Sequence, residues 1–148
     1  ALPEPARRAS LHGAFAEGLD LFDAGFFGIS PAEAVEMDPQ QRVVLEQVAL
    51  AMRDAGLSKE EVKGTRCGVY LGITQAVVGG AVAKGAAPSV YAANSTNVAA
   101  AAGRISFVFD LHGPCAAYDT ACSSSLVALH AAAASLRAGE CDLAVVAG

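Results

Sequence analysis

The sequence predicts an α/β domain in which helices pack on a sheet in layers. Segments with helical periodicity alternate along the chain with short apolar segments typical of strands, and this alternation favours a layered α/β fold. Hydrophobic residues make up 53% of the 148 residues and charged residues 17%. A chain of this length and composition has enough apolar side chains for one buried core and is too apolar for a disordered chain.

The first thirty residues show neither helical nor strand periodicity. Within them, "FDAGFFGISP" sets three phenylalanines among glycines and then stops at Pro31. This composition predicts a loop that aromatic side chains hold against the core.

A helix of about 18 residues is predicted from "MDPQQRVVLEQVALAMRDAGL". Asp38 suits the N-cap, and Pro39 suits the first helical position, where a missing N–H costs nothing. Gln41, three residues after Asp38, gives an approximate capping box, and Gly56 suits the position after the helix end. Apolar residues recur at three- and four-residue steps and give the helix one apolar face: Val44, Leu45, Val48 and Met52.

Three short apolar segments predict strands. "RCGVYLGI" (66–73) combines β-branched and aromatic residues between glycines, which is typical of a buried strand. "CAAYDT" (115–120) and "DLAVVAG" (142–148) are the other two predicted strands. Residues 74–93 are rich in Gly and Ala with little periodicity, and they predict a loop or a loose helix.

Two further helices are predicted between these strands. "NSTNVAAAAGRISFVF" supplies capping residues and then a helix to about Phe109. "CSSSLVALHAAAASLRAG" (122–139) predicts a helix that Gly139 closes. Its positions are apolar or Ala almost all round, so we expect this helix to be buried on most sides.

Charge and hydropathy exclude several classes of function. The net charge is −5, the only basic run is Arg7-Arg8, and basic residues do not interleave with aromatic ones, so no nucleic acid partner is expected. No apolar stretch reaches the length of a membrane span, and "ALPEPARRASLHG" lacks the order of a secretory signal. We expect a cytoplasmic setting; an organelle reached after removal of a transit peptide stays open.

The cysteines and histidines show no metal-binding spacing, so no metal site is expected. There is no C-x-x-C motif, and the histidines (His12, His112 and His130) form no zinc pattern with the cysteines. Three of the four cysteines are interpreted as small buried side chains in a reduced protein: Cys67, Cys115 and Cys141.

Cys122 is the candidate nucleophile, because it lies where a predicted strand passes into a predicted helix. A helix N-terminus favours a thiolate over a thiol, and its free N–H groups can bind an oxyanion. A tight turn there would present the side chain at the edge of the sheet. The small neighbours of Cys122, Ala121 and the serines at 123–125, leave room for an acyl group. The spacing leaves open two alternatives: that Cys122 is a small buried side chain that only fills space in the core, and that the serines only cap the helix.

No histidine or lysine is convincingly placed to act as a base for Cys122. His130 lies eight residues further on, about 12 Å along a helix, which exceeds hydrogen-bond reach. His112 lies in the turn before the strand and could approach Cys122 only through folding, and His12 is remote.

Three motifs resemble the β-ketoacyl synthases of type I polyketide synthases and fatty acid synthases. "DTACSSSLVALHAAAASLRAGECDLAVVAG" resembles their active-site segment, and "LFDAGFFGISPAEAVEMDPQQRVVLEQ" resembles an upstream signature. "AAGRISFVFDLHGP" resembles the helix and turn before the active-site strand, with alanines at 100–102 where serine is common. The resemblance runs from about Arg8 to Gly148, in the family's order and spacing.

The resemblance implies a thiolase-like fold, a duplicated α/β architecture of which residues 1–148 are most of the first half. It implies that Cys122 accepts an acyl group from an acyl carrier protein and that the acyl-enzyme condenses with a decarboxylating malonyl-type unit. The substrates would be carried on the phosphopantetheine of the acyl carrier protein, with no cofactor bound directly, and Ala121 would border the acyl pocket. It also implies a homodimer that pairs through "CAAYDT".

Several parts of the family pattern are missing from this sequence: the first strand before Ala1, and the two histidines and glycine-rich segment of the C-terminal half. We therefore expect that the chain alone does not complete a condensation. An alternative interpretation is a non-catalytic ketosynthase-derived segment with a structural role in a larger assembly. An unrelated cysteine hydrolase is a further alternative, which would also need a base.

Overall fold

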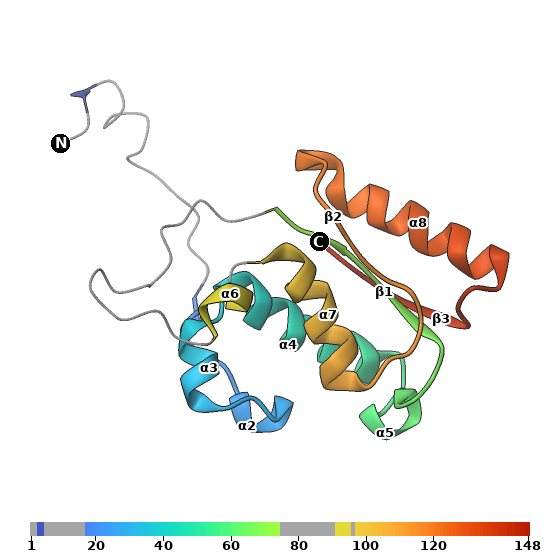
Figure 1. The fold of residues 1–148 in the computed structure, drawn as a ribbon, viewed down its shortest axis with the longest axis horizontal. Coiled ribbons are helices and arrows are strands. Elements are labelled where there is room, and N and C mark those ends of the chain that lie inside the picture. The colour runs from blue at the N-terminus through green and yellow to red at the C-terminus, as the bar shows by residue number, and fades with distance from the viewer. Residues whose placement is uncertain (1–2, 5–16, 75–90, 96) are drawn as a thin grey trace.

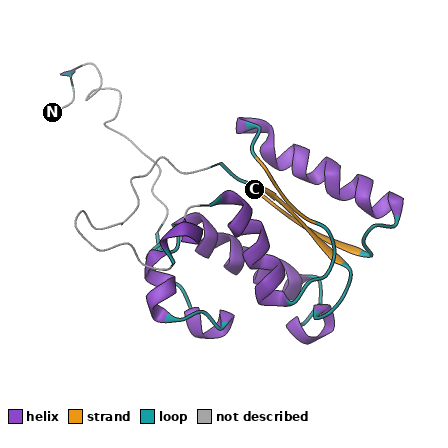
Figure 2. Cartoon of the chain, in the orientation of Figure 1, coloured by secondary structure: helices purple, strands orange, loops and turns teal. Residues whose placement is uncertain are grey.

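A computed structural model describes residues 3–4, 17–74, 91–95 and 97–148. In it, three parallel strands form one sheet with helices on both faces (Figure 1, Figure 2). The order of the strands in the sheet is β2-β1-β3. Their bounds are Cys67–Gly72 for β1, Cys115–Tyr118 for β2 and Leu143–Ala147 for β3. The predicted α/β class and the three predicted strands are confirmed.

Two helices cover one face of the sheet, α4 (Pro39–Asp54) and α7 (Val98–Phe109), and α8 (Ser124–Ala138) covers the other (Figure 1). Side chains of β1 alternate between the two faces, as the pleat of a strand requires. Val69 and Leu71 lie in the larger core with α4 and α7, whereas Tyr70 packs with the buried alanines of α8.

The N-terminal segment contains two short helices, so the prediction of a continuous loop is wrong. They are α2 (Ala24–Phe27) and α3 (Pro31–Glu36). Local caps explain both: the Asp23 carboxylate accepts the Phe26 N–H at 2.9 Å, and the Ser30 hydroxyl accepts the Glu33 N–H at 3.2 Å. Pro31 thus opens a helix instead of ending a segment.

The aromatic part of the same prediction is confirmed. Phe27 is buried, its ring stacks on Phe22 with centroids 5.1 Å apart, and it meets Phe109 of α7 edge-on. Phe26, by contrast, is 57% exposed. The aromatic contacts of Phe27 hold α2 against the helical layer.

Helix α4 begins as predicted, but Gln41 does not complete a capping box. The Asp38 carboxylate accepts the Gln40 N–H at 2.8 Å. Gln41 faces the core, and its side-chain amide donates to the carbonyl oxygens of Asn94 and Ser95, each at 3.1 Å. The side chain therefore satisfies backbone groups before α7 instead of the start of its own helix. Gly56 follows the helix end with φ +74°, as expected.

The remaining helices agree in part with the predictions. Helix α5 (Lys59–Val62) was not predicted, although Ser58 and Glu61 form a full capping box at its start. Asn97 caps α7, which ends at Phe109 as predicted. From the predicted loop at 74–93, residues 75–90 lie outside the described part, and the short α6 (Ala92–Ser95) begins at its end.

Helix α8 begins two residues later than predicted, and it is buried on one face only. A 3₁₀ turn, η1 (Ala121–Ser123), precedes it, and Gly139 closes it with φ +70°. The prediction of burial on most sides is wrong, because only one side of α8 meets the sheet. Its outer side leaves three leucines 70%, 53% and 42% exposed: Leu126, Leu129 and Leu136. Among the helices of the described residues, none combines the length and the hydropathy needed to cross a bilayer.

Candidate active site

Cys122 lies where the carboxyl ends of the parallel strands meet. Strand β2 ends at Tyr118, and after two intervening residues the chain enters η1, which carries Cys122 just before α8. The Cys122 side chain is exposed. Crevices at the carboxyl ends of parallel strands are the usual ligand sites of open α/β sheets.

Ser124 closes the turn that carries Cys122. Its Oγ accepts the Thr120 N–H at 2.8 Å and donates to the Ala121 carbonyl oxygen at 2.8 Å. Ser124 is only 7% exposed, so both hydrogen bonds are shielded from water. Between these two bonds, Ala121 adopts φ +52°, a left-handed conformation that costs a non-glycine residue about 1–2 kcal/mol. The Ser124 hydrogen bonds help to hold this strained backbone directly before Cys122.

Asp119 connects the same turn to the end of β1. One carboxylate oxygen accepts the Thr74 hydroxyl at 2.8 Å, and the other accepts the Ala121 N–H at 3.3 Å. The turn is thus attached to the sheet at two places: it follows β2 directly in the chain, and Asp119 bonds it to the end of β1.

Glycine at 72 allows the start of α8 to lie directly on the sheet edge. A Cβ on Gly72 would lie 2.6 Å from the Ser124 carbonyl carbon and 2.6 Å from the Ser125 nitrogen. Both atoms belong to the backbone and cannot turn away. The Ser123 hydroxyl donates back to the Thr120 carbonyl at 2.9 Å and makes no capping bond to α8. The N–H of Ser124, the first residue of α8, donates to the Ala121 carbonyl oxygen, so the turn itself supplies its partner.

The structure brings no described histidine to Cys122. His112 precedes β2 at the opposite end of that strand, where its Nε2 lies 3.0 Å from an Asp110 carboxylate oxygen. His130 is exposed on α8, more than two turns beyond Cys122. His12 lies outside the described residues. A base for Cys122 is therefore not found among the histidines that the structure describes.

The other cysteines differ in burial. Cys67 and Cys141 are buried, as predicted, and burial raises the pKa of the Cys67 thiol. Cys115 is exposed, so the prediction of its burial is wrong, because β2 is an edge strand. Within the described ranges, no cluster of three or more His, Cys, Asp or Glu side chains could hold a metal ion.

Sequence reasoning did not single out Ser124, Asp119 or Gly72, although one signal for Ser124 was present. The buried positions of α8 follow a helical step of four and then three: Ser124, Ala128, Ala132 and Ser135. This spacing places only the second of the three serines after Cys122 on the buried face.

Comparison with known proteins identifies the family. The family model described as "Beta-ketoacyl synthase, N-terminal domain" matches residues 3–148. The chain is 48% identical over 136 residues to the phenolphthiocerol synthesis polyketide synthase type I Pks15/1 of Mycobacterium bovis, covering 92% of this chain. It is 46% identical over 149 residues to the erythronolide synthase EryA3 of Saccharopolyspora erythraea, covering 99% of this chain.

Solved structures agree with the sequence comparison. The ketosynthase from module 6 of the bacillaene synthase of Bacillus subtilis 168 matches 89% of this chain, with a TM-score of 0.74 and 38% identity. The oxazolomycin ketosynthase domain OzmH KS7 of Streptomyces albus JA3453 matches 90%, with a TM-score of 0.77 and 37% identity.

The chain is much shorter than all of these proteins. It spans 6% and 5% of the two curated relatives and 22% and 24% of the two solved ketosynthase chains. The predicted thiolase-like fold is confirmed as a partial α/β unit of that kind. By its family model, its relatives among type I polyketide synthases and its structural neighbours, the chain belongs to the β-ketoacyl synthase family.

Proposed function

We propose that residues 1–148 form part of a ketosynthase domain in which Cys122 accepts the acyl group. The observation that carries this proposal is the exposed Cys122 on a strained turn at the carboxyl edge of the sheet, directly before α8. This is the arrangement of a nucleophile elbow. Family membership supplies the reaction class.

The proposed chemistry is transfer of an acyl group from one thioester to another. The Cys122 sulfur attacks the thioester carbonyl of an acyl group carried on the phosphopantetheine of an acyl carrier protein. The carbonyl oxygen becomes an oxyanion beside the N-terminus of α8, whose partial positive charge stabilises it. The bond to the pantetheine sulfur then breaks, and this sulfur leaves as a thiol with the proton that Cys122 has lost. Ala121, exposed beside Cys122, borders the incoming acyl chain.

The condensation that follows uses groups outside this chain. The acyl-enzyme would react with a decarboxylating malonyl-type extender in polyketide or fatty acid synthesis. We assign the residues that assist decarboxylation to the rest of the parent domain, since the described histidines lie away from Cys122.

We also propose that two copies pair through β2. This strand lies at the edge of the sheet, and within the described residues it pairs only with β1. An unpaired strand edge is a ready template for a second chain.

A non-catalytic, structural role in a larger assembly is the second candidate. The observation that favours it is the outer face of α8, where three leucines are exposed. Exposed apolar patches mark sites where another protein surface packs.

Acyl transfer to the chain itself separates the two candidates. The chain is incubated with the propionyl thioester of N-acetylcysteamine, and the acylated cysteines are located by peptide mass spectrometry. We expect acylation at Cys122 well above that of Cys115, which is also exposed in the single chain and is the internal control at protein concentrations where the chain is monomeric. Cys122→Ala should remove the signal. Equal acylation of both cysteines, or none at Cys122, would support the structural candidate.

A further inference from the structure

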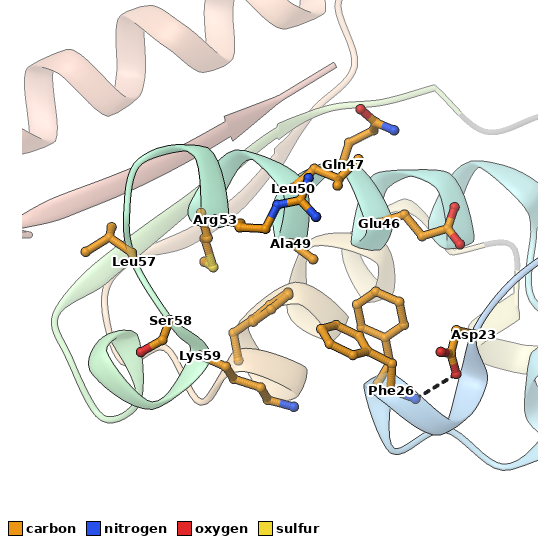
Figure 3. Close-up of a pocket in the computed structure, with 13 residues that line it drawn as sticks. Asp23, Phe26, Glu46, Gln47, Ala49, Leu50, Arg53, Leu57, Ser58 and Lys59 are labelled. Atoms are coloured by element: carbon orange, nitrogen blue, oxygen red, sulfur yellow. Dashed lines mark hydrogen bonds between the residues drawn. The ribbon is translucent and has the colours of Figure 1, made fainter.

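A cavity lies away from Cys122, on the opposite side of the sheet from α8. It has a volume of about 600 Å³ and opens between α2, α4, α5 and the end of α7 (Figure 3). Apolar side chains dominate its wall: Phe26, Phe27, Ala49, Met52, Leu57 and Phe109. Concave sites of 300–1,000 Å³ with mostly apolar walls are typical of small-molecule binding.

The cavity exists because a short side chain occupies a central position of α4. Ala49 follows the buried Leu45 by four residues and precedes the buried Met52 by three, so it faces the same side of the helix. A larger apolar side chain at this position would project between α2 and the end of α7. With only a methyl group at 49, part of the space between α2, α4 and the end of α7 is left empty.

Positive charge lies at one side of this cavity. The Lys59 ammonium lies 5.9 Å from the centre of the Phe109 ring, and no ion pair of Lys59 is found among the described residues. Arg53 also lines the cavity, but its guanidinium extends beside Leu50, away from the Lys59 ammonium (Figure 3).

The acidic groups of the cavity lie on the other side. Figure 3 shows Asp23 and Glu46 away from Lys59. The Asp23 carboxylate already accepts the Phe26 N–H at the start of α2. An anionic group in the cavity is therefore attracted to the Lys59 side and repelled from the Glu46 side.

We propose that this cavity binds a small carboxylic acid with a flat apolar body, such as an arylalkanoic acid. The aromatic ring would lie among Phe26, Phe27 and Phe109, where offset and edge-on ring contacts are favourable. The carboxylate would accept a hydrogen bond from the Lys59 ammonium. The site is separate from the acyl transfer proposed at Cys122 and does not depend on it.

Titration with 4-phenylbutyrate tests the proposal, with the neutral 4-phenylbutanamide as its matched probe. Binding is followed by two-dimensional NMR of the isotope-labelled chain. We expect the shift changes to concentrate at Phe26, Leu50 and Phe109, and the acid to bind about fivefold more tightly than the amide. Lys59→Gln should lower the affinity for the acid to that for the amide. Lys63→Gln, an exposed lysine outside the cavity, should change neither.

Filling the cavity gives the second arm of the test. Ala49→Trp should abolish binding of both probes while the melting temperature stays the same or rises, because the new ring occupies existing space. If Ala49→Trp does not fold, Ala49→Leu fills part of the same space and should weaken binding. The proposal is overturned if a folded Ala49 variant binds as the parent chain does, or if the shift changes gather on the exposed leucines of α8.

Discussion

At the scale of single residues, the proposed chemistry depends on a turn that is held against its own strain. Ala121 adopts a left-handed conformation that costs about 1–2 kcal/mol, and Ser124 makes two shielded hydrogen bonds across the same turn. Strained backbone that surrounding contacts hold in place is typical of functional sites. The strain therefore fits a turn that presents the Cys122 side chain to a substrate.

The thiols should differ in reactivity according to their position. We expect iodoacetamide near pH 7 to alkylate Cys122 fastest, the exposed Cys115 more slowly, and the buried Cys67 and Cys141 only after unfolding. Burial also raises the pKa of Cys67, which keeps it protonated and unreactive. Peptide mass spectrometry over a time course measures all four rates. A Cys122 rate no greater than that of Cys115 would remove the claim of an activated nucleophile.

Ser124→Ala should loosen the turn. The substitution leaves the Thr120 N–H without its acceptor and removes one of the two donors to the Ala121 carbonyl, whose other donor is the Ser124 backbone N–H. We therefore expect a loss of about 1–3 kcal/mol in the free energy of unfolding. The alkylation rate of Cys122 relative to Cys115 should fall several-fold at temperatures far below melting.

Two comparisons separate this effect from a general loss of stability. Ser125→Ala, at an exposed neighbouring position, should leave both the free energy of unfolding and the rate ratio unchanged. The ratio to Cys115 matters because a general loss of stability would change the alkylation rates of both exposed thiols alike. An unchanged ratio in Ser124→Ala would mean that Ser124 supports the fold but does not position Cys122.

The sequence could reveal Cys122 but not its support. Cys122 follows a strand and precedes a helix in the chain itself, so local patterns find it. Asp119 and Thr74 are hydrogen-bonded although they lie 45 positions apart in the sequence. Position 72 requires glycine because the backbone at the start of α8 lies directly against it. Contacts of this kind depend on the arrangement of strands and helices in space, which no local pattern contains.

At the scale of elements, the contact of β1 with α8 requires glycine at 72. Gly72→Ala would place a methyl carbon 2.6 Å from two backbone atoms at the start of α8, so the helix must shift. We expect a loss of about 1–3 kcal/mol in the free energy of unfolding, measured in urea, and a changed alkylation rate of Cys122. Gly103→Ala is the control, because a Cβ there meets nothing within 4 Å and α7 should gain about 0.5–1 kcal/mol. Equal effects of the two substitutions would contradict the role of Gly72.

Local signals predicted the longer helices better than the short ones. Asp38 and Pro39 start α4, and Gly139 ends α8, each through chemistry that lies within a few residues. Helices α2 and α5 have four residues each, too few to show a 3.6-residue period, and only their capping residues indicated them. The exposed side of α8 was missed because composition cannot show which neighbours a helix has.

At the scale of the whole molecule, alternation along the chain predicted the α/β class but not the order of the strands. β1 comes first in the chain yet lies between β2 and β3. This central place buries all six of its residues and sets Cys67 and Tyr70 on opposite faces of the sheet. The middle strand therefore carries two buried weak acids that the fold must keep neutral.

These two groups should make the molecule sensitive to alkali. Burial is the main cause that raises the pKa of Cys67 and also that of Tyr70. In the unfolded chain, the two groups lose their protons near their usual pKa values of about 8.5 and about 10. Above about pH 8.5 the unfolded state therefore binds fewer protons than the folded state, and the free energy of unfolding must fall as the pH rises toward the folded pKa values. Urea unfolding at pH 7 to 10.5 measures this slope.

Substitution of either group should make the free energy of unfolding fall less steeply as the pH rises. Tyr70→Phe removes the hydroxyl, and Cys67→Ala removes the thiol; the second lowers stability at every pH because it leaves a small void, but its slope should still be shallower. Tyr118→Phe is the control, because Tyr118 on the edge strand is only half-buried. Its slope should match that of the parent chain. If the double variant Cys67→Ala, Tyr70→Phe kept the full slope, other groups would cause the loss of stability at high pH. The two buried groups of β1 would then not explain the pH dependence of the free energy of unfolding.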